Sequence, residues 1–527
     1  MYKLTKIFNN EMYSINKKNI FDYPTNSAYG YACWLEYIEE LKKKFKFIIE
    51  IPTREKYEFI HKSIYGGRVS ANIKKFINIQ YYDLLNEELL KMNMSKNDYI
   101  ISDEKTKNII DIEISKKMNY IDVKKLKDFI FNADVSSLYP TSMAGNDIFN
   151  VKFPVGFSRW SEEPEKEFNE DKYGFYEIEY IAPKNINYPI LPRRKEDGGI
   201  IWDLLPGKGI YTNVDIRNAK KVGYEIKFIN KCLVYDNTRD DIFIGYINKF
   251  YNLKAAEDNK PENERNEARR EICKLLMNGL YGKMLQCPIF EHEIITNNVN
   301  EIYEFLKNND FIDLDILDEN KVLLKGKSII DNEEDCINKP SQFGSFILSY
   351  SREIMQFYNM QLDPELKKFT VSYTDTDSMH IDAELYEKLK NNGFIPDEAQ
   401  LGYLSNDLKK KGDGIIIQEI NLGAKMYMYK YINKNNEIGT VIKAKGMPKK
   451  YLTQKYFLEE CGKVIIKESF QKVFNKPTKK EREEKINMYS IYKKDITREF
   501  NKNKWCGREL REDGLYYPWG YIGEEVY

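Results

Sequence analysis

Apolar and polar residues alternate most clearly around Val371–Ile381, which reads VSYTDTDSMHI. Apolar and β-branched residues run up to a short polar turn and away from it, which predicts a β-hairpin. In strand geometry Asp375 and Asp377, two residues apart, share a face. Two like charges held so close favour a cation between them, and carboxylate oxygens suit Mg²⁺. An ordinary polar turn is the alternative, because Asp, Thr and Ser are common turn residues.

A second apolar stretch also ends in a carboxylate. Residues Phe129–Ala133 predict a buried strand that runs into Asp134, and Pro140 then forbids ladder pairing and lets a helix begin. A carboxylate at a strand end, followed by backbone amides and the aromatic Tyr139, is a usable platform for a metal ion and a triphosphate. Further strand patterns cover Gly174–Ile181, Tyr188–Leu191, Glu225–Tyr235 and Gln418–Tyr431.

Helical periodicity is clear over Asp240–Ala256, and after a polar break a second helix runs to about Lys283. The short break predicts an antiparallel helical hairpin. On the second helix three polar residues fall four apart and share a face, namely Arg270, Lys274 and Asn278. With Lys254 near the same tip, three cations would cradle a triphosphate. A solvated face is the usual explanation of such a stripe alone.

The remaining segments carry weaker patterns. Residues 284–340 read as an insertion, with strands at about 289–296 and 321–327 flanking a helix at 299–307 and an acidic loop. A helix over Ser345–Met360 leads to the hairpin. Residues 69–127 read as strand-like and charged pieces, and the C-terminal segment as mostly helical.

The overall charge of the chain neither indicates nor excludes a polyanionic partner. The 527 residues include 82 Lys plus Arg and 82 Asp plus Glu, so the formal net charge is zero. From Val441 to Leu510, basic residues outnumber acidic ones by about two to one with aromatics interleaved, which suits a phosphate backbone. A solvated helical surface is the alternative, which Glu481, Glu483 and Glu484 favour.

Cysteine and histidine usage argues against a zinc site. The seven cysteines are scattered without a CxxC pair, and the three histidines stand alone. This pattern fits a reducing interior. No secretory leader opens the chain and no apolar run reaches membrane length, so we expect a soluble intracellular protein without a membrane partner.

Three of these elements carry a resemblance. Asp134-x-x-Ser137-Leu138-Tyr139-Pro140, Lys274-x-x-x-Asn278-x-x-Tyr281-Gly282 and Tyr373-x-Asp375-Thr376-Asp377-Ser378 follow one another in this order. They resemble the A, B and C motifs of family B DNA polymerases. The resemblance covers about residues 64–445 and, more loosely, the basic C-terminal segment as a thumb. It implies an α+β right-hand polymerase with a palm of antiparallel sheet and helices, two-helix fingers and a small thumb.

Within that family the chain is most similar to the protein-primed branch of phages and linear plasmids. That branch has a glycine pair before motif A, matched by Gly66 and Gly67. The long interval before Lys254 and the block at 284–340 stand where the branch carries two terminal-protein-region insertions. Two further elements resemble its template-binding and primer-binding motifs, namely Ser349-Tyr350-Ser351-Arg352 and Lys425-Met426-Tyr427.

Two departures from the branch stand out. Motif B has Gly279 where Ser is usual, which would loosen template contacts. Only some 60 residues precede the glycine pair, too few for the family's 3′–5′ exonuclease. Asp111-Ile112-Glu113 imitates an exonuclease motif on the wrong side of that pair, and we interpret it as chance. The expectation is a polymerase without exonuclease, or one whose nuclease is a separate chain or was removed.

The resemblance implies roles for individual residues. Asp134 and Asp377 would bridge two Mg²⁺ ions, for which Mn²⁺ can substitute, with Asp375 auxiliary and the Val135 carbonyl a further ligand. The nucleotide would contact Tyr139, Lys254, Arg270, Lys274, Asn278 and Tyr281. DNA would contact Gly66, Gly67, Gly282, Ser349, Arg352, Lys425 and Tyr427.

The implied domains follow the motifs along the chain. They are an N-terminal segment 1–63, a first palm part 64–240 with an insertion at about 155–235, fingers 241–283, an insertion 284–340, a second palm part 341–440 and a thumb 441–527.

The implied function is template-directed DNA synthesis with primer-template DNA, dNTPs and a terminal-protein primer as partners. The chain would replicate a viral or linear-plasmid genome in the host cytoplasm, or in the mitochondrion if plasmid-borne. Two alternatives remain: a priming or end-extending polymerase of the same fold, and a non-catalytic nucleic-acid-binding relative, which should have lost a metal carboxylate.

Overall fold

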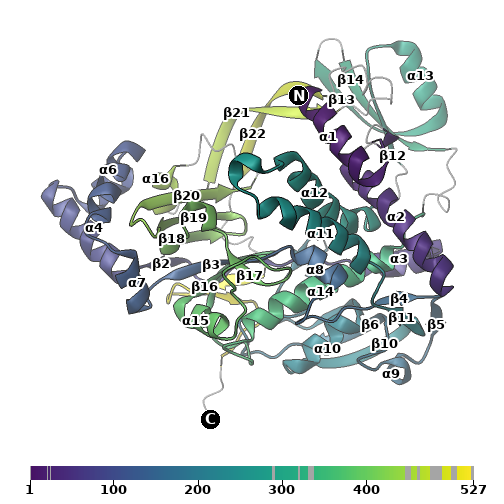
Figure 1. Cartoon of the computed structure of the whole chain (residues 1–527), viewed down its shortest axis with the longest axis horizontal. Coiled ribbons are helices and arrows are strands. Elements are labelled where there is room, and N and C mark those ends of the chain that lie inside the picture. Colours follow the sequence, from purple (N-terminus) through teal and green to yellow (C-terminus); the bar gives the residue numbers. More distant parts are fainter. Residues whose placement is uncertain are drawn as a thin grey trace.

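The computed structural model describes residues 2–19, 22–23, 25–196, 198–287, 291–318, 321–329, 337–445, 453–459, 463–474, 489–499 and 507–523. Its centre is a nine-stranded antiparallel sheet with the order β1-β15-β16-β3-β18-β19-β20, in which β17 also pairs with β3 and β2 with β18. These strands are β1 Val69–Ala71, β2 Lys75–Ile77, β3 Ile130–Val135, β15 Val371–Asp375, β16 Ser378–Asp382, β17 Leu404–Asn406, β18 Ile415–Gly423, β19 Met426–Ile432 and β20 Ile438–Ala444. Distant parts of the chain therefore meet in one sheet (Figure 1).

The central strand β3 explains how this sheet sorts its side chains. Period-two alternation sends Phe131, Ala133 and Val135 into the apolar core. Asn132 and Asp134 therefore lie on the opposite face. The core below the sheet also contains side chains of α14 (Ser341–Asn359) and α15 (Ala383–Asn391). A carboxylate at position 134 thus reaches the open side of a rigidly packed strand.

Helix α14 is the central support of the molecule. Its side chains are buried on nearly every side, as expected of a helix that crosses a core. It contacts α8 (Leu138–Ala144), α10 (Asn213–Lys221), α12 (Glu267–Met284) and α3 (Arg54–Lys62). The helix predicted at 345–360 is confirmed and begins one turn earlier.

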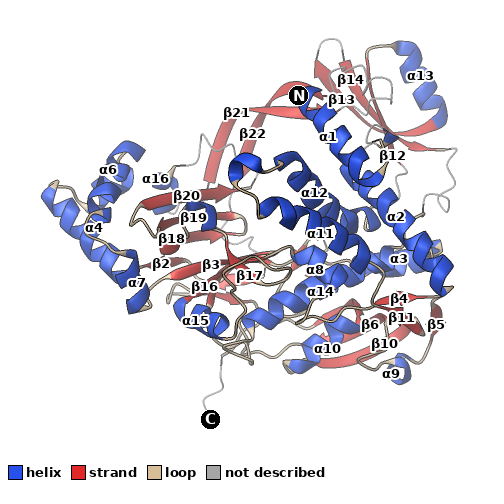
Figure 2. Cartoon of the chain, viewed as in Figure 1, coloured by secondary structure: helices blue, strands red, loops and turns tan. Residues whose placement is uncertain are grey.

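The predicted helical hairpin is also confirmed, as α11 (Ile244–Asp258) and α12. It stands over α8, and the N-terminal helices α1 (Tyr2–Asn16) and α2 (Asn26–Phe45) lie against α12 (Figure 2). The Trp34 indole N–H of α2 donates to the Ile242 carbonyl over 3.1 Å, just before α11. The N-terminal helices therefore brace the hairpin from outside.

Two inserted sheets lie away from the centre. The first has the order β5-β10-β6-β9 and packs against α10, and the second has the order β12-β14-β13 and packs against α13 (Val299–Asn308). Their strands are β5 Arg159–Ser161, β6 Gly174–Ile181, β9 Gly207–Thr212, β10 Glu225–Val234, β12 Glu291–Thr296, β13 Asn309–Asp318 and β14 Lys321–Ser328. The predicted strands at 174–181, 225–235, 289–296 and 321–327 and the helix at 299–307 are confirmed.

A helical unit fills the interval between β2 and β3, where the sequence analysis expected strand-like pieces. It contains α4 Ile79–Lys91, α5 Lys96–Ile101, α6 Glu104–Ser115 and α7 Tyr120–Leu126, and lies beside the sheet (Figure 1). Asp111 of α6 forms a buried ion pair with Lys430 of β19 over 2.6 Å, and Tyr81 and Tyr99 complete the network. Asp111 of the Asp-Ile-Glu sequence therefore has a structural role here.

Two expectations about the inserted segments were wrong. Tyr188–Leu191 forms no strand, because Pro189 lies inside it and the segment instead follows an irregular path. The acidic loop of the insertion is in part the strand β13, whose Asp310 and Asp313 face Lys327 and Lys325 in register. Cross-strand pairing thus overrides the weak strand propensity of aspartate.

The segment expected to be mostly helical contains, in its described residues, one short helix and several strands. These are α16 Gln454–Leu458, β21 Lys463–Phe474, β22 Tyr489–Glu499, β23 Arg508–Leu510 and β24 Tyr516–Pro518. Glu481, Glu483 and Glu484 lie outside the described residues. The smaller elements are β4 Phe153–Val155, β7 Arg193–Arg194, β8 Ile200–Ile201, β11 Asn237–Arg239 and α9 Pro164–Glu167. No helix in the described residues is long and apolar enough to cross a membrane.

Candidate active site

The hairpin at the centre of the site is the one predicted from its alternating pattern. β15 and β16 pair with Asp375 opposite Ser378, so Thr376 and Asp377 form the turn. Thr376 has φ +64°, which is strained for a β-branched residue. Its N–H donates to the Arg68 carbonyl over 2.7 Å, and a Cβ added at Gly67 would lie 2.8 Å from its methyl group. Gly67 therefore permits the backbone approach that holds this turn.

Asp134 lies directly beside this turn. β3 pairs with β16 so that Asp134 is opposite Ser378, and the Val135 N–H donates to the Asp377 carbonyl over 2.8 Å. Ser137, with φ +64°, then turns the chain into α8. Two segments more than two hundred residues apart thus place their carboxylates side by side on one rigid sheet.

In both members of the pair the ionised form of the carboxyl group is disfavoured. Burial, together with the charges of Asp377 and Asp407, raises the pKa of Asp134 to about 8, and Lys274 opposes the shift. Burial likewise raises the pKa of Asp377, with Asp375 and Asp407 adding to it. A bound cation would relieve both. Oxygen ligands in this arrangement suit a hard divalent metal.

The third predicted carboxylate is held differently. Asp375 forms an ion pair with Lys425 and accepts a hydrogen bond from the Thr376 hydroxyl over 3.2 Å. Lys425 has φ +57°, and its N–H donates to the Tyr373 hydroxyl over 2.7 Å. Tyr427 packs on Tyr373 with ring centroids 4.6 Å apart. The predicted primer-binding motif therefore contacts the predicted catalytic hairpin.

The described residues contain no group of three or more His, Cys, Asp and Glu side chains arranged to hold a metal ion. Asp134 and Asp377 form instead a two-carboxylate site. Mg²⁺ is commonly held by one or two carboxylates, with substrate phosphates and water completing its shell. The donors present fit a divalent cation that is completed by a phosphorylated substrate.

The helical hairpin brings an aromatic pair to the same place. Tyr139 of α8 and Tyr281 of α12 stack with ring centroids 4.0 Å apart and 20° between their planes. Gly282 has open space where a side chain would be, whereas a Cβ at Gly279 would lie 2.7 Å from the Ser27 hydroxyl of α2. Glycine at 279 thus allows α2 to approach α12, which explains the departure from the family's usual Ser.

The predicted cations of the hairpin face the same side. Arg270, Lys274 and Asn278 follow one stripe of α12, and the opposite stripe is buried. Lys274 is exposed, and its charge acts on Asp134. Lys254 and Arg270 both contact Asp258, at 2.9 and 2.5 Å. Lys274 therefore lies within electrostatic range of the palm carboxylate Asp134, and Arg270 stands one turn away on the same stripe of α12.

A comparison with known protein families shows to which family this chain belongs. The sequence matches DNA polymerase type B, organellar and viral, over residues 1–85 and 96–363, which is more than half of the chain. This chain belongs to that family.

Relatives in other organisms agree with this membership. The probable DNA polymerase of Neurospora intermedia is 27% identical over 329 residues, covering 60% of this chain and 30% of the relative. The DNA polymerase of Kluyveromyces lactis is 30% identical over 279 residues, covering 48% and 24%. The chain spans less than a third of the length of either relative.

Solved polymerase structures share the fold. Phi29 DNA polymerase in its complex with primer-template DNA and incoming nucleotide substrates has a TM-score of 0.57 at 16% identity, covering 90% of this chain and 67% of that one. Its orthorhombic crystal form has a TM-score of 0.58 at 15% identity, covering 90% and 68%. The predicted α+β right-hand polymerase fold is therefore confirmed, and we call the central sheet the palm and α11–α12 the fingers.

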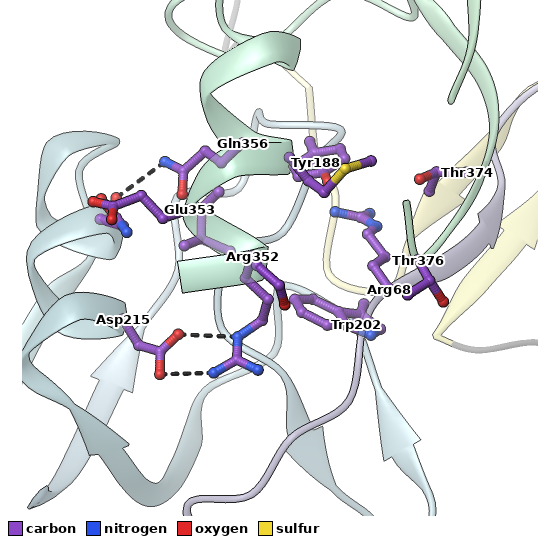
Figure 3. A pocket seen from close by; sticks show the side chains of 14 residues that line it. Arg68, Tyr188, Trp202, Asp215, Arg352, Glu353, Gln356, Thr374 and Thr376 are labelled. Carbon is purple, nitrogen blue, oxygen red and sulfur yellow. Dashed lines mark hydrogen bonds and ion pairs between the residues drawn. The ribbon is translucent and has the colours of Figure 1, made fainter. Parts of the chain in front are cut away.

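Ser349 and Arg352, predicted to contact template, are buried in this chain. The Arg352 guanidinium donates to the Asp215 carboxylate over 3.0 and 2.8 Å (Figure 3). The Ser349 hydroxyl also donates to Asp215, over 2.7 Å. Arg352 also donates to the Tyr65 carbonyl, next to the glycine pair. Both residues are buried, and their hydrogen bonds join α14 to α10 and to the Tyr65 carbonyl. Gly66 itself has open space around it.

Sequence reasoning missed one carboxylate of the site. Asp407 follows β17, which pairs with β3 so that Ser405 is opposite Asp134. The Asp407 N–H donates to the Asn132 carbonyl over 3.0 Å, and its charge acts on both Asp134 and Asp377. The three-residue strand before it is too short to give a periodic signal.

Proposed function

We propose that this chain is a template-directed DNA polymerase that adds dNTPs to a primer 3′-hydroxyl. The observation that carries the proposal is the meeting of Asp134 and Asp377 across β3 and β16, each with a raised pKa. Members of this family depend on divalent metal, and we propose two Mg²⁺ ions, for which Mn²⁺ can substitute. When bound, such ions activate the attacking hydroxyl and neutralise the leaving pyrophosphate.

The surrounding residues complete the reaction geometry. Asp134, Asp377 and the Val135 carbonyl would hold the cations, with Asp375 positioning Lys425 beside the primer end. The ammonium groups of Lys274 and Lys254 and the planar guanidinium group of Arg270 would bind the triphosphate oxygens. The stacked Tyr139 and Tyr281 would form the floor beneath the nucleotide sugar and base. Gly66, Gly282 and Tyr427 offer close approach to DNA.

Replacement of one carboxylate tests this assignment. Asp377→Asn should abolish primer extension with four dNTPs and Mg²⁺ while DNA binding stays measurable, because the cation loses a charged ligand. Asp397→Asn removes the same charge from an exposed loop and should extend primers normally. Retained synthesis in Asp377→Asn would contradict the proposal.

We further propose that the first hydroxyl comes from a terminal protein during replication of a viral or linear-plasmid genome. Membership of the family supports this proposal. The two inserted sheets, with the strand orders β5-β10-β6-β9 and β12-β14-β13, support it as well. The experiment supplies labelled dNTP, template and the proteins encoded by the same genetic element. A nucleotide covalently joined to one of those proteins is expected, and extension of DNA primers without any such product would reject protein priming.

A further inference from the structure

Asp258, the last residue of α11, binds two cations from the two helices of the fingers. Lys254 Nζ lies 2.9 Å from Oδ2, and Arg270 Nε lies 2.5 Å from Oδ1. One carboxylate therefore engages both cations, with one oxygen for each. The side chains of Lys254, Arg270 and Asp258 keep 18, 15 and 32% of their surface exposed. A ligand can thus reach this cluster from solvent.

We propose that Asp258 is an internal counter-anion of the nucleotide site. It pairs with both Lys254 and Arg270 and offsets one of their two positive charges while no nucleotide is bound, and the triphosphate of an incoming dNTP displaces it. The inference rests on the proposed function, because it takes these two cations as triphosphate ligands. It adds a residue that tunes nucleotide affinity without touching the reacting atoms.

The neighbouring Glu257 separates this role from a purely structural one. Glu257 is buried, accepts hydrogen bonds from the Asn266 N–H and Lys260 Nζ over 2.9 and 2.8 Å, and so closes the turn between the helices. Arg265 donates to the carbonyls of Glu257 and Asp258 over 3.2 and 3.0 Å. The turn is therefore held by groups other than the Asp258 carboxylate, whose hydrogen bonds within the described residues go to Lys254 and Arg270.

Lys274 shows the contrasting state of a fingers cation. It lies one turn beyond Arg270 on the same stripe, is exposed, and makes no ion pair within the described part of the chain. Its positive charge acts on the Asp134 carboxyl of the palm. An incoming triphosphate can therefore bind Lys274 first and then exchange with Asp258 at the other two cations.

The exchange is physically reasonable because the Asp258 pairs are partly exposed. Burial would raise the pKa of Asp258, but hydrogen bonds from Arg270 and Lys254 hold it below its ordinary value, so the carboxylate is charged at neutral pH. Partly exposed ion pairs are weak compared with buried ones. A triphosphate offers more negative charge and more acceptor oxygens than one carboxylate, so it competes effectively.

Inorganic tripolyphosphate tests the exchange without polymerase activity. Asp258→Asn keeps the shape and removes the charge, so tripolyphosphate measured by titration calorimetry should bind about three- to tenfold more tightly than to the wild type. Glu271→Gln is the matched control, because Glu271 contacts Arg270 over 2.8 Å and does not bridge to Lys254. It should change affinity less than about twofold. Unchanged or weaker binding in Asp258→Asn would overturn the proposal.

Steady-state kinetics add a second measurement. Asp258→Asn should lower KM for dNTP by a similar factor with little change in kcat, and a higher KM would show that Asp258 merely positions its cations. Asp258→Ser replaces it if thermal melting shows that Asp258→Asn is misfolded. Wild-type protein that synthesises no DNA while Asp258→Asn still tightens tripolyphosphate binding would reject the polymerase function alone. Active wild type with unaltered tripolyphosphate binding would reject the counter-anion alone.

Discussion

Raising the pH from about 7 to about 9 should tighten divalent-cation binding to the palm, because a proton competes with the cation at Asp134. Burial and the charges of Asp377 and Asp407 raise the pKa of Asp134 to about 8. Below that value the carboxyl is mainly protonated and is a poor ligand. Affinity should therefore be lost as the pH falls through about 8 and be restored as it rises.

The magnitude follows from the ionised fraction. With a pKa of about 8, roughly a tenth of Asp134 is ionised at pH 7 and roughly nine-tenths at pH 9. The apparent affinity scales with the competent fraction, so it should rise about tenfold over this interval. At pH 7 cation binding should release close to one proton from Asp134. The raised pKa of Asp377 acts in the same direction.

Titration calorimetry with Mn²⁺, in buffers of different ionisation enthalpy, measures both affinity and proton release. Asp134→Asn has no titrating group at this position, so its residual cation binding should lose most of the pH dependence. Asp407→Asn removes a neighbouring negative charge and should shift the midpoint to lower pH. Cation binding that is independent of pH, with no proton release, would refute the electrostatic account of the pair.

Two further predictions concern the stability of the buried core and the selection of the nucleotide sugar. Lys430→Met leaves Asp111 buried without its cation and should lower the free energy of unfolding, measured in urea, by about 3–5 kcal/mol. The double variant Lys430→Met with Asp111→Asn should recover part of this loss. A double variant no more stable than Lys430→Met would exclude the pairing. Tyr139→Val removes the ring stacked on Tyr281 and should lower discrimination against ribonucleotides by about tenfold or more. The measurement is the ratio of kcat/KM for a dNTP to kcat/KM for the matching ribonucleotide. An unchanged ratio would exclude Tyr139 from sugar selection.

The parts of the site that could be predicted are those encoded over short stretches. Alternation at 371–381 predicted the hairpin, and a four-residue spacing on one helix predicted the face that carries Arg270 and Lys274. These patterns depend on strand and helix periods alone. The branch-specific motifs added Gly66 and Gly67, and the structure gives Gly67 a reason in the strained turn at Thr376.

The missed parts depend on contacts between distant segments. Asp407 enters the site because β17 pairs with β3, and a three-residue strand has no recognisable period. Arg352 is buried because Asp215, from an inserted segment, lies opposite it. The basic C-terminal segment has helix-favouring Lys and Glu, yet β21 and β22 pair along their length. Strand pairing of this kind is set by the partner, which local propensity does not contain.

Resting charge in the two halves of the site implies an order of binding. In the described part of the chain, Asp134 and Asp377 make no ion pair, and their raised pKa values show that these palm carboxyls resist ionisation until a cation binds. In the fingers, Asp258 pairs with both Lys254 and Arg270 and offsets one of their two positive charges. A free triphosphate therefore brings more negative charge to carboxyl groups that already resist ionisation, and it meets fingers cations that are already paired. A triphosphate that arrives with its own divalent cation supplies the positive charge that the palm carboxyls need and can then displace Asp258, so metal-bound nucleotide is the species that this arrangement favours.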